Sequence, residues 1–200
     1  MRQCYLFDYE DSFTHNIASE LRMLEFNVLV IPFSEIKNFL TNFETTKEKV
    51  VFIHGPGPGH PEDYRDLFPA IKKSFLLKNV YQVGLCLGHQ IFCTLWGGKV
   101  ERSNHPMHGQ RVEMEIPLWS VFPPKFQGKK IQVQRYNSLS LLSKKKKLFR
   151  NSPTDLKLAW QDNELFLTSS SQFLTYQFHP ESVGTSYRSL FFKPLEKFLL

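Results

Sequence analysis

The residue with the clearest chemical potential is Cys86, which has a glycine two positions before it and another two positions after it. The apolar run at residues 80–83 is typical of a buried strand, and a helical pattern follows the cysteine. A Gly-x-Cys-x-Gly turn between strand and helix is the thiol form of a nucleophile elbow, in which Gly84 and Gly88 let the two elements pack closely. Backbone N–H groups at the start of the helix would favour the thiolate and hold an oxyanion. The motif therefore predicts a cysteine that attacks a carbonyl, although an isolated copy of it also fits a buried structural cysteine.

His179 and Glu181 can supply the rest of a cysteine hydrolase, which needs an acid or base within hydrogen-bond reach and a group that orients it. The pair follows an apolar strand pattern, and alternation along an extended segment would put both side chains on one side of the chain. Any one of the seven histidines is more often a surface or satisfied core residue than a catalyst. Together with the cysteine elbow and the glycine-rich segment 55–59, which also follows a strand pattern, the pair nevertheless specifies a site.

Strand and helix patterns alternate through the first hundred residues. Strands are predicted at residues 3–7, 27–32, 50–53 and 80–83, and helices after a cap at Asp11 or Ser12, from Ser34 to residue 40, at 67–77 and through 91–96, with a loop at 41–49. This alternation predicts right-handed βαβ units, and hence a mostly parallel central sheet with helices on both faces. Ligands bind at the carboxyl ends of such strands, where Asp8, the Gly57–Gly59 loop and Cys86 all fall.

The second hundred residues carry shorter strand patterns separated by turn residues. These strands are predicted at residues 112–116, 131–135, 156–161, 165–168 and 175–178, before a closing helix at 186–199 that is interrupted near Pro194. The predicted fold class is therefore α/β, a mostly parallel central sheet with helices on both faces plus short antiparallel strands in the C-terminal half. A chain of 200 residues with 42% hydrophobic content suits one full-sized domain, so we expect a single domain over residues 1–200.

Composition excludes several other function classes. The net charge of +6 and the run Lys144–Lys147 suggest nucleic-acid binding, but the run is short and lacks interleaved aromatic residues. The favoured interpretation of this lysine run is a solvated loop, and no nucleic-acid partner is expected. No apolar run approaches the roughly 20 residues that span a bilayer, so no membrane partner is expected. Three sparse cysteines and the lack of a signal-peptide pattern predict a cytoplasmic protein with reduced thiols, and without ligand spacing no metal or cofactor is expected.

The segments around the two candidate catalytic positions, Gly84 to Gln90 and Gln177 to Ser182, resemble the signature blocks of the class I (triad-type) glutamine amidotransferases, which have a flavodoxin-like fold. Further segments are similar to the small amidotransferase subunit of anthranilate synthase (component II) and of 4-amino-4-deoxychorismate synthase. These segments are residues 8–16, 56–63, 107–109 and 135–139. The blocks run from near the first residue to near the last in the family's order, which makes the resemblance highly specific.

The resemblance implies hydrolysis of L-glutamine, with the ammonia passed to a larger chorismate-binding synthase subunit in a hetero-oligomer. Cys86 would form a γ-glutamyl thioester, His179 would protonate the departing ammonia and then activate water, and Glu181 would orient His179. The positions that the resemblance assigns to glutamine and oxyanion binding are Gly57, Pro58, Gly59, Leu87, Gln90, Ser138 and Leu139, with the N–H groups of Gly57 and Leu87 on the oxyanion. Met107, His108 and Gly109 would lie toward the partner subunit.

Some positions depart from the family pattern. His54 and Gly55 stand where a small hydroxyl residue is usual, His15 replaces a tyrosine, Asn137 a histidine and Gln110 a lysine. None of these changes removes a member of the proposed triad. The alternatives are a stand-alone γ-glutamyl cysteine hydrolase of the same fold and a non-catalytic regulatory scaffold. The sequence also leaves open whether the product is anthranilate, for tryptophan, or 4-amino-4-deoxychorismate, for folate.

Overall fold

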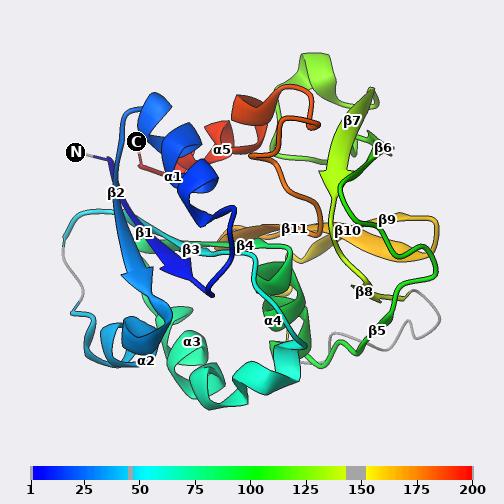
Figure 1. Cartoon of the computed structure of the whole chain (residues 1–200). Coiled ribbons are helices and arrows are strands. Elements are labelled where there is room, and N and C mark those ends of the chain that lie inside the picture. The colour runs from blue at the N-terminus through cyan, green and yellow to red at the C-terminus, as the bar shows by residue number, and fades with distance from the viewer. Residues whose placement is uncertain (1, 45–46, 143–151, 200) are drawn as a thin grey trace.

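A seven-stranded sheet forms the centre of the computed structural model, which describes residues 2–44, 47–142 and 152–199 (Figure 1). In spatial order its strands are β2 (Phe26–Pro32), β1 (Arg2–Asp8), β3 (Val50–His54), β4 (Val80–Leu85), β11 (Phe173–Tyr176), β10 (Glu164–Ser169) and β9 (Lys157–Gln161). Neighbours from β2 to β11 are parallel, whereas β10 pairs antiparallel with both β11 and β9. This arrangement confirms the predicted α/β class, with a parallel first half and antiparallel pairing in the second.

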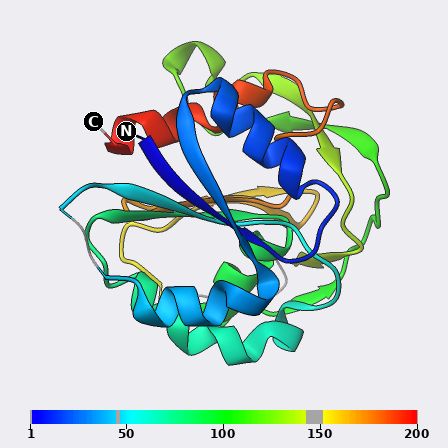
Figure 2. The same cartoon turned by 60° about the vertical axis from the view of Figure 1, so that its left-hand side comes forward.

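Helices cover both faces of the sheet, as Figure 2 shows. The α-helices of the described chain are α1 (Thr14–Met23), α2 (Phe33–Asn42), α3 (Phe68–Ser74), α4 (Leu87–Leu95) and α5 (Lys193–Leu199), with 3₁₀ turns η1 (Pro61–Leu67), η2 (Pro124–Phe126) and η3 (Arg188–Phe191). One buried cluster joins the sheet to α1 and α5, and a second joins it to α2, α3 and α4. Every residue of β3 and β4 is buried, as expected for strands covered on both faces.

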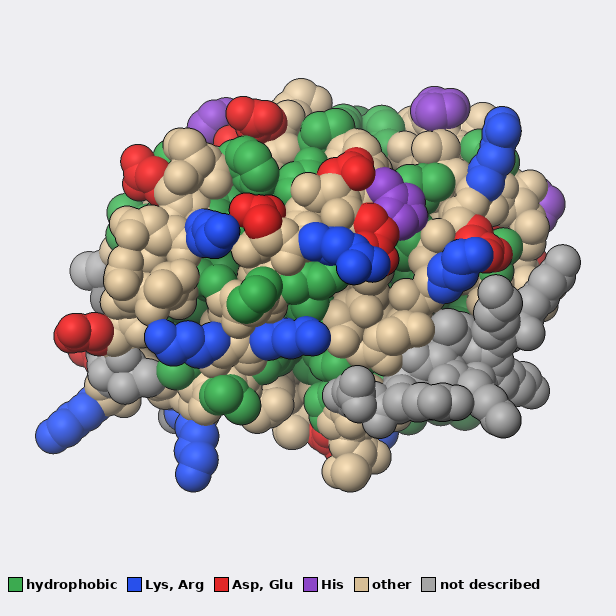
Figure 3. All heavy atoms as spheres, turned by 90° about the horizontal axis from the view of Figure 1, so that it is seen from below, with side chains coloured by type: hydrophobic (Ala, Val, Ile, Leu, Met, Phe, Trp, Pro, Cys, Tyr) green, Lys and Arg blue, Asp and Glu red, His purple; other side chains and the backbone are tan. Residues whose placement is uncertain are grey.

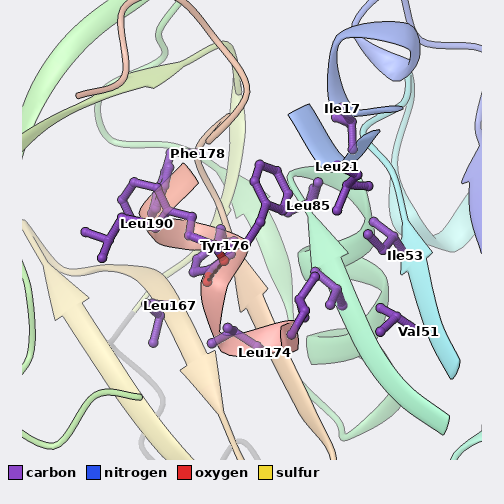
Figure 4. Close-up of a cluster of buried hydrophobic side chains, with 14 of the residues drawn as sticks. Ile17, Leu21, Val51, Ile53, Leu85, Leu167, Leu174, Tyr176, Phe178 and Leu190 are labelled. Carbon is purple, nitrogen blue, oxygen red and sulfur yellow. Dashed lines mark hydrogen bonds between the residues drawn. The ribbon is translucent and has the colours of Figure 1, made fainter. Parts of the chain in front are cut away.

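The cluster under α1 is drawn in Figure 4, where side chains of several strands meet those of the helix. Ile17 and Leu21 of α1 belong to the same buried cluster as Ile53 of β3, Leu85 of β4 and Tyr176 of β11, and all five are at most 1% exposed. Fully burying one such apolar side chain contributes about 1.5–3 kcal/mol, so this contact holds α1 and the central strands in one unit.

Two short antiparallel pairs lie outside the large sheet. One is the ribbon of β6 (Gln110–Glu115) and β7 (Lys130–Arg135), and the other pairs β5 (Val100–Arg102) with β8 (Leu139–Leu141). The ribbon strands agree with the sequence prediction. The sequence prediction missed β5 and β8, because three residues carry too little alternation to indicate a strand.

Several predicted boundaries are wrong. The region predicted as one helix at 67–77 is η1 followed by α3, which ends at Ser74, and α2 extends two residues into the predicted loop at 41–49. The closing helix is split at Phe192, ahead of Pro194, which lies in the first turn of α5, where a missing N–H removes no helical bond. The run Lys144–Lys147 lies outside the described residues.

The predicted cap of the first helix is correct in part. Phe13 occupies the N-cap position of α1 and makes no side-chain cap bond. Asp11 nevertheless stabilises the start of the helix, because its Oδ1 accepts a 2.8 Å hydrogen bond from the Phe13 N–H and its carbonyl accepts a 3.2 Å bond from the Thr14 N–H. Asp8 adds to this support, because its Oδ1 accepts a 2.7 Å hydrogen bond from the Thr14 hydroxyl and further bonds from two backbone N–H groups.

Figure 3 views the molecule from below Figure 1, the side on which α2, η1 and α3 lie. Lys and Arg side chains on this face are separated by other side chains instead of forming one continuous patch. None of the helices in the described part of the chain has the length and apolar character needed to cross a bilayer.

Candidate active site

Cys86 forms the junction between β4 and α4. Its backbone has φ 50° and ψ −99°, a conformation that a non-glycine residue rarely adopts, and its N–H donates a 2.8 Å hydrogen bond to the Tyr176 carbonyl. A Cβ on Gly84 would lie 2.7 Å from the Gly88 carbonyl, and one on Gly88 would lie 2.1 Å from the His54 carbonyl oxygen. Both glycines are therefore needed for strand and helix to approach, as the elbow motif predicts.

His179 and Glu181 are buried together in the turn that follows β11. The two residues are 2% exposed, and His179 Nδ1 lies 2.7 Å from Glu181 Oε1. Edges of the Phe13 and Tyr136 rings pack around the imidazole, with ring centroids 5.2 and 4.8 Å away. The contact with Glu181 holds the imidazole at its Nδ1 atom, so Nε2 is left to interact with a reacting group.

The charge on His179 is set by its neighbours. Burial alone would disfavour the imidazolium, but the Glu181 carboxylate and the Cys86 thiolate outweigh it and raise the pKa of His179 well above its usual value. The arrangement thus favours the protonated imidazolium form of His179.

Cys86 opens into a pocket of about 190 Å³. The pocket is lined by Gly57, Pro58, Gly59, Cys86, Leu87, Gln90, Tyr136, Asn137, Ser138 and Leu139. The structure thus brings together every position that the resemblance assigns to glutamine or oxyanion binding. Tyr136 and Asn137 were not among the predicted site residues, although they lie inside the motif at 135–139 that could have indicated them. A larger cavity of about 330 Å³ lies between the β6–β7 ribbon and β9–β10, away from Cys86.

The glycine-rich loop lies directly against the start of α4. The Gly55 carbonyl accepts a 3.2 Å hydrogen bond from the Gly88 N–H, and the Pro58 carbonyl accepts a 2.9 Å bond from the Tyr64 hydroxyl. A Cβ on Gly57 would lie 2.6 Å from both Leu87 Cδ2 and Tyr9 Cβ. Only glycine therefore fits at this position. The Leu87 N–H, at the first position of α4, has no intrahelical partner.

Two amides hold the opposite wall of the pocket. Gln90 Nε2 and Asn137 Nδ2 each donate a 2.9 Å hydrogen bond to the Leu139 carbonyl, and Gln90 Nε2 also lies 3.2 Å from Gln177 Oε1. The Gln90 amide nitrogen is thus hydrogen-bonded within the protein. It helps to fix the position of residues 138 and 139, which are predicted to contact the substrate. Gln177 Nε2 in turn lies 3.8 Å from Cys86 Sγ.

A buried ion pair supports this wall from behind. Arg135 and Glu164 form a salt bridge with side chains 3% and 0% exposed, and Arg135 Nε donates a 3.0 Å hydrogen bond to Asn137 Oδ1. Asn137 is one of the departures from the family pattern, and here it connects the ion pair to the Leu139 carbonyl.

His54, another departure, lies behind the glycine-rich loop and not in the pocket. It is fully buried, and its Nδ1 lies 2.8 Å from the Tyr9 hydroxyl. Burial lowers the pKa of His54 to about 3, so the ring is neutral at physiological pH. Its packing against the Phe7 and Phe92 rings indicates a core role.

The segment Met107–Gly109 runs beside the same wall. The Met107 N–H donates to the Asn137 carbonyl at 3.1 Å, and the Gly109 N–H donates to the Arg135 carbonyl at 2.9 Å. His108 is exposed. The described residues include no group of three or more His, Cys, Asp or Glu side chains arranged to hold a metal ion.

Comparison with known proteins shows the family to which the chain belongs. The family model for glutamine amidotransferase class-I matches residues 5–198. The chain therefore belongs to the class I glutamine amidotransferase family, which confirms the resemblance inferred from its sequence motifs.

Similar curated relatives carry the name anthranilate synthase component 2. The relative from Helicobacter pylori is 31% identical over 189 residues, covering 90% of this chain and 89% of that protein. The relative from Saccharolobus solfataricus is 30% identical over 198 residues, covering 97% and 96%. The relative from Leptospira biflexa is 33% identical over 195 residues, covering 90% and 92%.

A solved structure from Thermoplasma acidophilum, described as a candidate GMP synthase subunit, has the same fold. It superposes with a TM-score of 0.77 at 18% identity, covering 100% of this chain and 94% of that one.

Proposed function

We propose that this chain is a glutaminase subunit that hydrolyses L-glutamine through Cys86, His179 and Glu181 and delivers the ammonia to a chorismate-using synthase. One observation carries the proposal. The Cys86 side chain, at a strained elbow, lines a pocket whose walls are the glycine-rich loop and residues 136–139, and it interacts with a histidine that Glu181 holds.

The first half of the reaction is attack on the side-chain amide. The Cys86 thiolate adds to the amide carbon of glutamine, and the oxygen that becomes negative faces the N–H groups of Gly57 and Leu87. Such a preorganised donor contributes about 3 kcal/mol to the transition state. The C–N bond then breaks as the His179 imidazolium gives its proton to the leaving nitrogen, which releases ammonia and leaves a γ-glutamyl thioester.

The second half is hydrolysis of the thioester. His179 Nε2 takes a proton from water as the water oxygen attacks the thioester carbon. The C–S bond breaks, glutamate leaves, and the thiolate–imidazolium pair is restored. Glu181 keeps Nε2 directed at the reacting atoms and stabilises the imidazolium in both halves.

The synthase partner is supported by the relatives named anthranilate synthase component 2. We propose that Met107, His108 and Gly109 contact this partner and that residues 1–200 form a single domain. The product of the assembly is anthranilate or 4-amino-4-deoxychorismate.

The test is glutamate release from L-glutamine by the purified chain, alone and with each candidate chorismate-binding subunit. Stimulation by one partner, lost in Cys86→Ser, supports both the chemistry and the assembly. Equal rates with and without every partner would favour a stand-alone hydrolase, and preferred cleavage of γ-glutamyl peptides would do so as well. No release with any partner, while the thiol also fails to react with a glutamine-analogue electrophile, would favour the non-catalytic scaffold.

A further inference from the structure

Gln134, near the end of β7, makes hydrogen bonds to two separate segments. Its side-chain Oε1 accepts a 2.8 Å bond from the Gly184 N–H, and its Nε2 donates a 3.0 Å bond to the Gly109 carbonyl. Its backbone carbonyl accepts a 2.9 Å bond from the His179 N–H. One residue thus ties the turn that carries His179 to the segment that ends at Gly109.

The turn after β11 is exposed at its tip and is held to β7 at its two ends. Val183 at its tip is 85% exposed. The Thr185 hydroxyl donates to the His179 carbonyl at 2.7 Å and accepts from the Gln134 N–H at 2.9 Å, which closes the turn back onto β7. A Cβ on Gly184 would lie 2.4 Å from Gln134 Oε1, so the amide packs tightly against the turn.

We propose that the Gln134 side chain is a positioning residue that fixes the turn of residues 179–185 relative to the segment Met107–Gly109, and so sets the position of His179 relative to Cys86. The link lies outside the Cys86 pocket, whose lining residues do not include Gln134. A displacement of the Gly109 carbonyl, such as contact with another protein chain would cause, reaches the His179 turn directly through this amide. This regulatory consequence rests on the proposed glutaminase function.

Three variants distinguish the effect of the Gln134 hydrogen bonds from the effect of side-chain packing. Gln134→Met keeps the length of the side chain and removes both hydrogen bonds, whereas Gln134→Glu keeps the acceptor for the Gly184 N–H and removes the donor to Gly109. Gln132→Met is the matched control. Gln132 lies two positions earlier on the same face of β7 and is also half-buried, and in the described structure only its backbone carbonyl is seen to bond the 182–186 region.

The first readout is the rate of Cys86 alkylation by iodoacetamide in the chain alone, localised by mass spectrometry. Cys4 and Cys93 are fully buried and do not compete. A displaced His179 stabilises the thiolate less, so Gln134→Met should react at least about threefold more slowly than wild type and Gln132→Met should not. The second readout is glutamine hydrolysis with the partner, where Gln134→Met should lower kcat about tenfold or more and leave KM within about twofold.

Gln134→Glu should fall between wild type and Gln134→Met in both readouts, and it decides the matter if the methionine variant does not fold. Alkylation rates and kcat values that match the Gln132→Met control would overturn the proposal. Parallel changes in kcat and KM with an unchanged alkylation rate would also overturn it, because a loss of packing alone predicts them. Absence of glutaminase activity in the wild type would refute the proposed function, while the alkylation comparison would still decide the role of Gln134.

Discussion

Substitution of Gly57 by alanine tests the proposed oxyanion site most directly. The new Cβ would lie 2.6 Å from Tyr9 Cβ and 3.1 Å from the Tyr9 carbonyl oxygen, whereas carbon atoms normally pack about 3.5–4.0 Å apart. Leu87 Cδ2, also at 2.6 Å, can rotate away, but the Tyr9 atoms belong to the start of a buried side chain and to the backbone. The loop at 55–59 must therefore shift by about 1 Å.

Gly57 does not have a positive φ, so the effect of the substitution is steric and not conformational. A shift of this size moves the Gly57 N–H out of hydrogen-bond range of the oxyanion. Loss of one such donor costs about 3 kcal/mol in the transition state, so kcat for glutamine hydrolysis should fall about 100-fold to 1,000-fold. Overpacking should also lower the free energy of unfolding by about 1–3 kcal/mol.

The assay compares glutamate release with iodoacetamide alkylation of Cys86, since alkylation needs the thiolate but no oxyanion hole. Gly57→Ala should retain an alkylation rate within about twofold of wild type. A kcat within about fivefold of wild type, in a folded variant, would refute the assignment of Gly57 as an oxyanion donor.

Three further predictions concern the triad and its support. Cys86→Ser should abolish glutamate release while the protein still binds its partner, because a serine hydroxyl does not ionise near neutral pH; residual release above about 1% of wild type would contradict a covalent role for the thiol. Glu181→Gln should lower kcat about 10-fold to 100-fold and remove the main influence that raises the pKa of His179. Since the folded pKa of His179 lies above its ordinary value of 6.5, its proton stabilises the wild-type fold below that pH, and the stabilisation is lost as the pH rises through the folded value. Urea unfolding across that range should show this dependence in wild type and a weaker one in Glu181→Gln; equal pH dependence in both would count against the pairing. Arg135→Met should cost about 3–5 kcal/mol in urea unfolding, because it leaves the buried Glu164 carboxylate unpaired, and adding Glu164→Gln should recover much of that loss. An Arg135→Met variant as stable as wild type would show that the ion pair does not contribute to the free energy of unfolding.

The parts of the site that depend on local motifs could be predicted from the sequence. The elbow needs small residues at fixed positions around Cys86, and the clash distances at Gly84 and Gly88 show why. His179 and Glu181 pair as their spacing predicted, although residues 179–182 form a hydrogen-bonded turn and not the extended segment that the prediction assumed. The parallel half of the sheet was likewise indicated by its alternating strand and helix patterns.

Features that depend on contacts between distant segments could not be predicted. Arg135 and Glu164 are 29 positions apart, and nothing in either local pattern indicates that they pair. Asp8 supports the loop before α1 together with the predicted Asp11, and its bond to the Thr14 hydroxyl, six positions later, is not indicated by any helix-start pattern. The Gln134 contacts with Gly109 and Gly184 require the β6–β7 ribbon to lie beside the turn after β11, which periodicity does not reveal.

The position of β11 in the sheet has a consequence for biosynthesis. β11 lies directly beside β4, with Tyr176 opposite Leu85, although the two strands are separated by almost half the chain. During translation, β1 to β4 and the elbow emerge well before the strand that delivers His179. A nascent chain therefore carries Cys86 without the histidine that we propose activates it, and the proposed Cys86–His179 pair forms only when β11 has been made and inserted between β4 and β10.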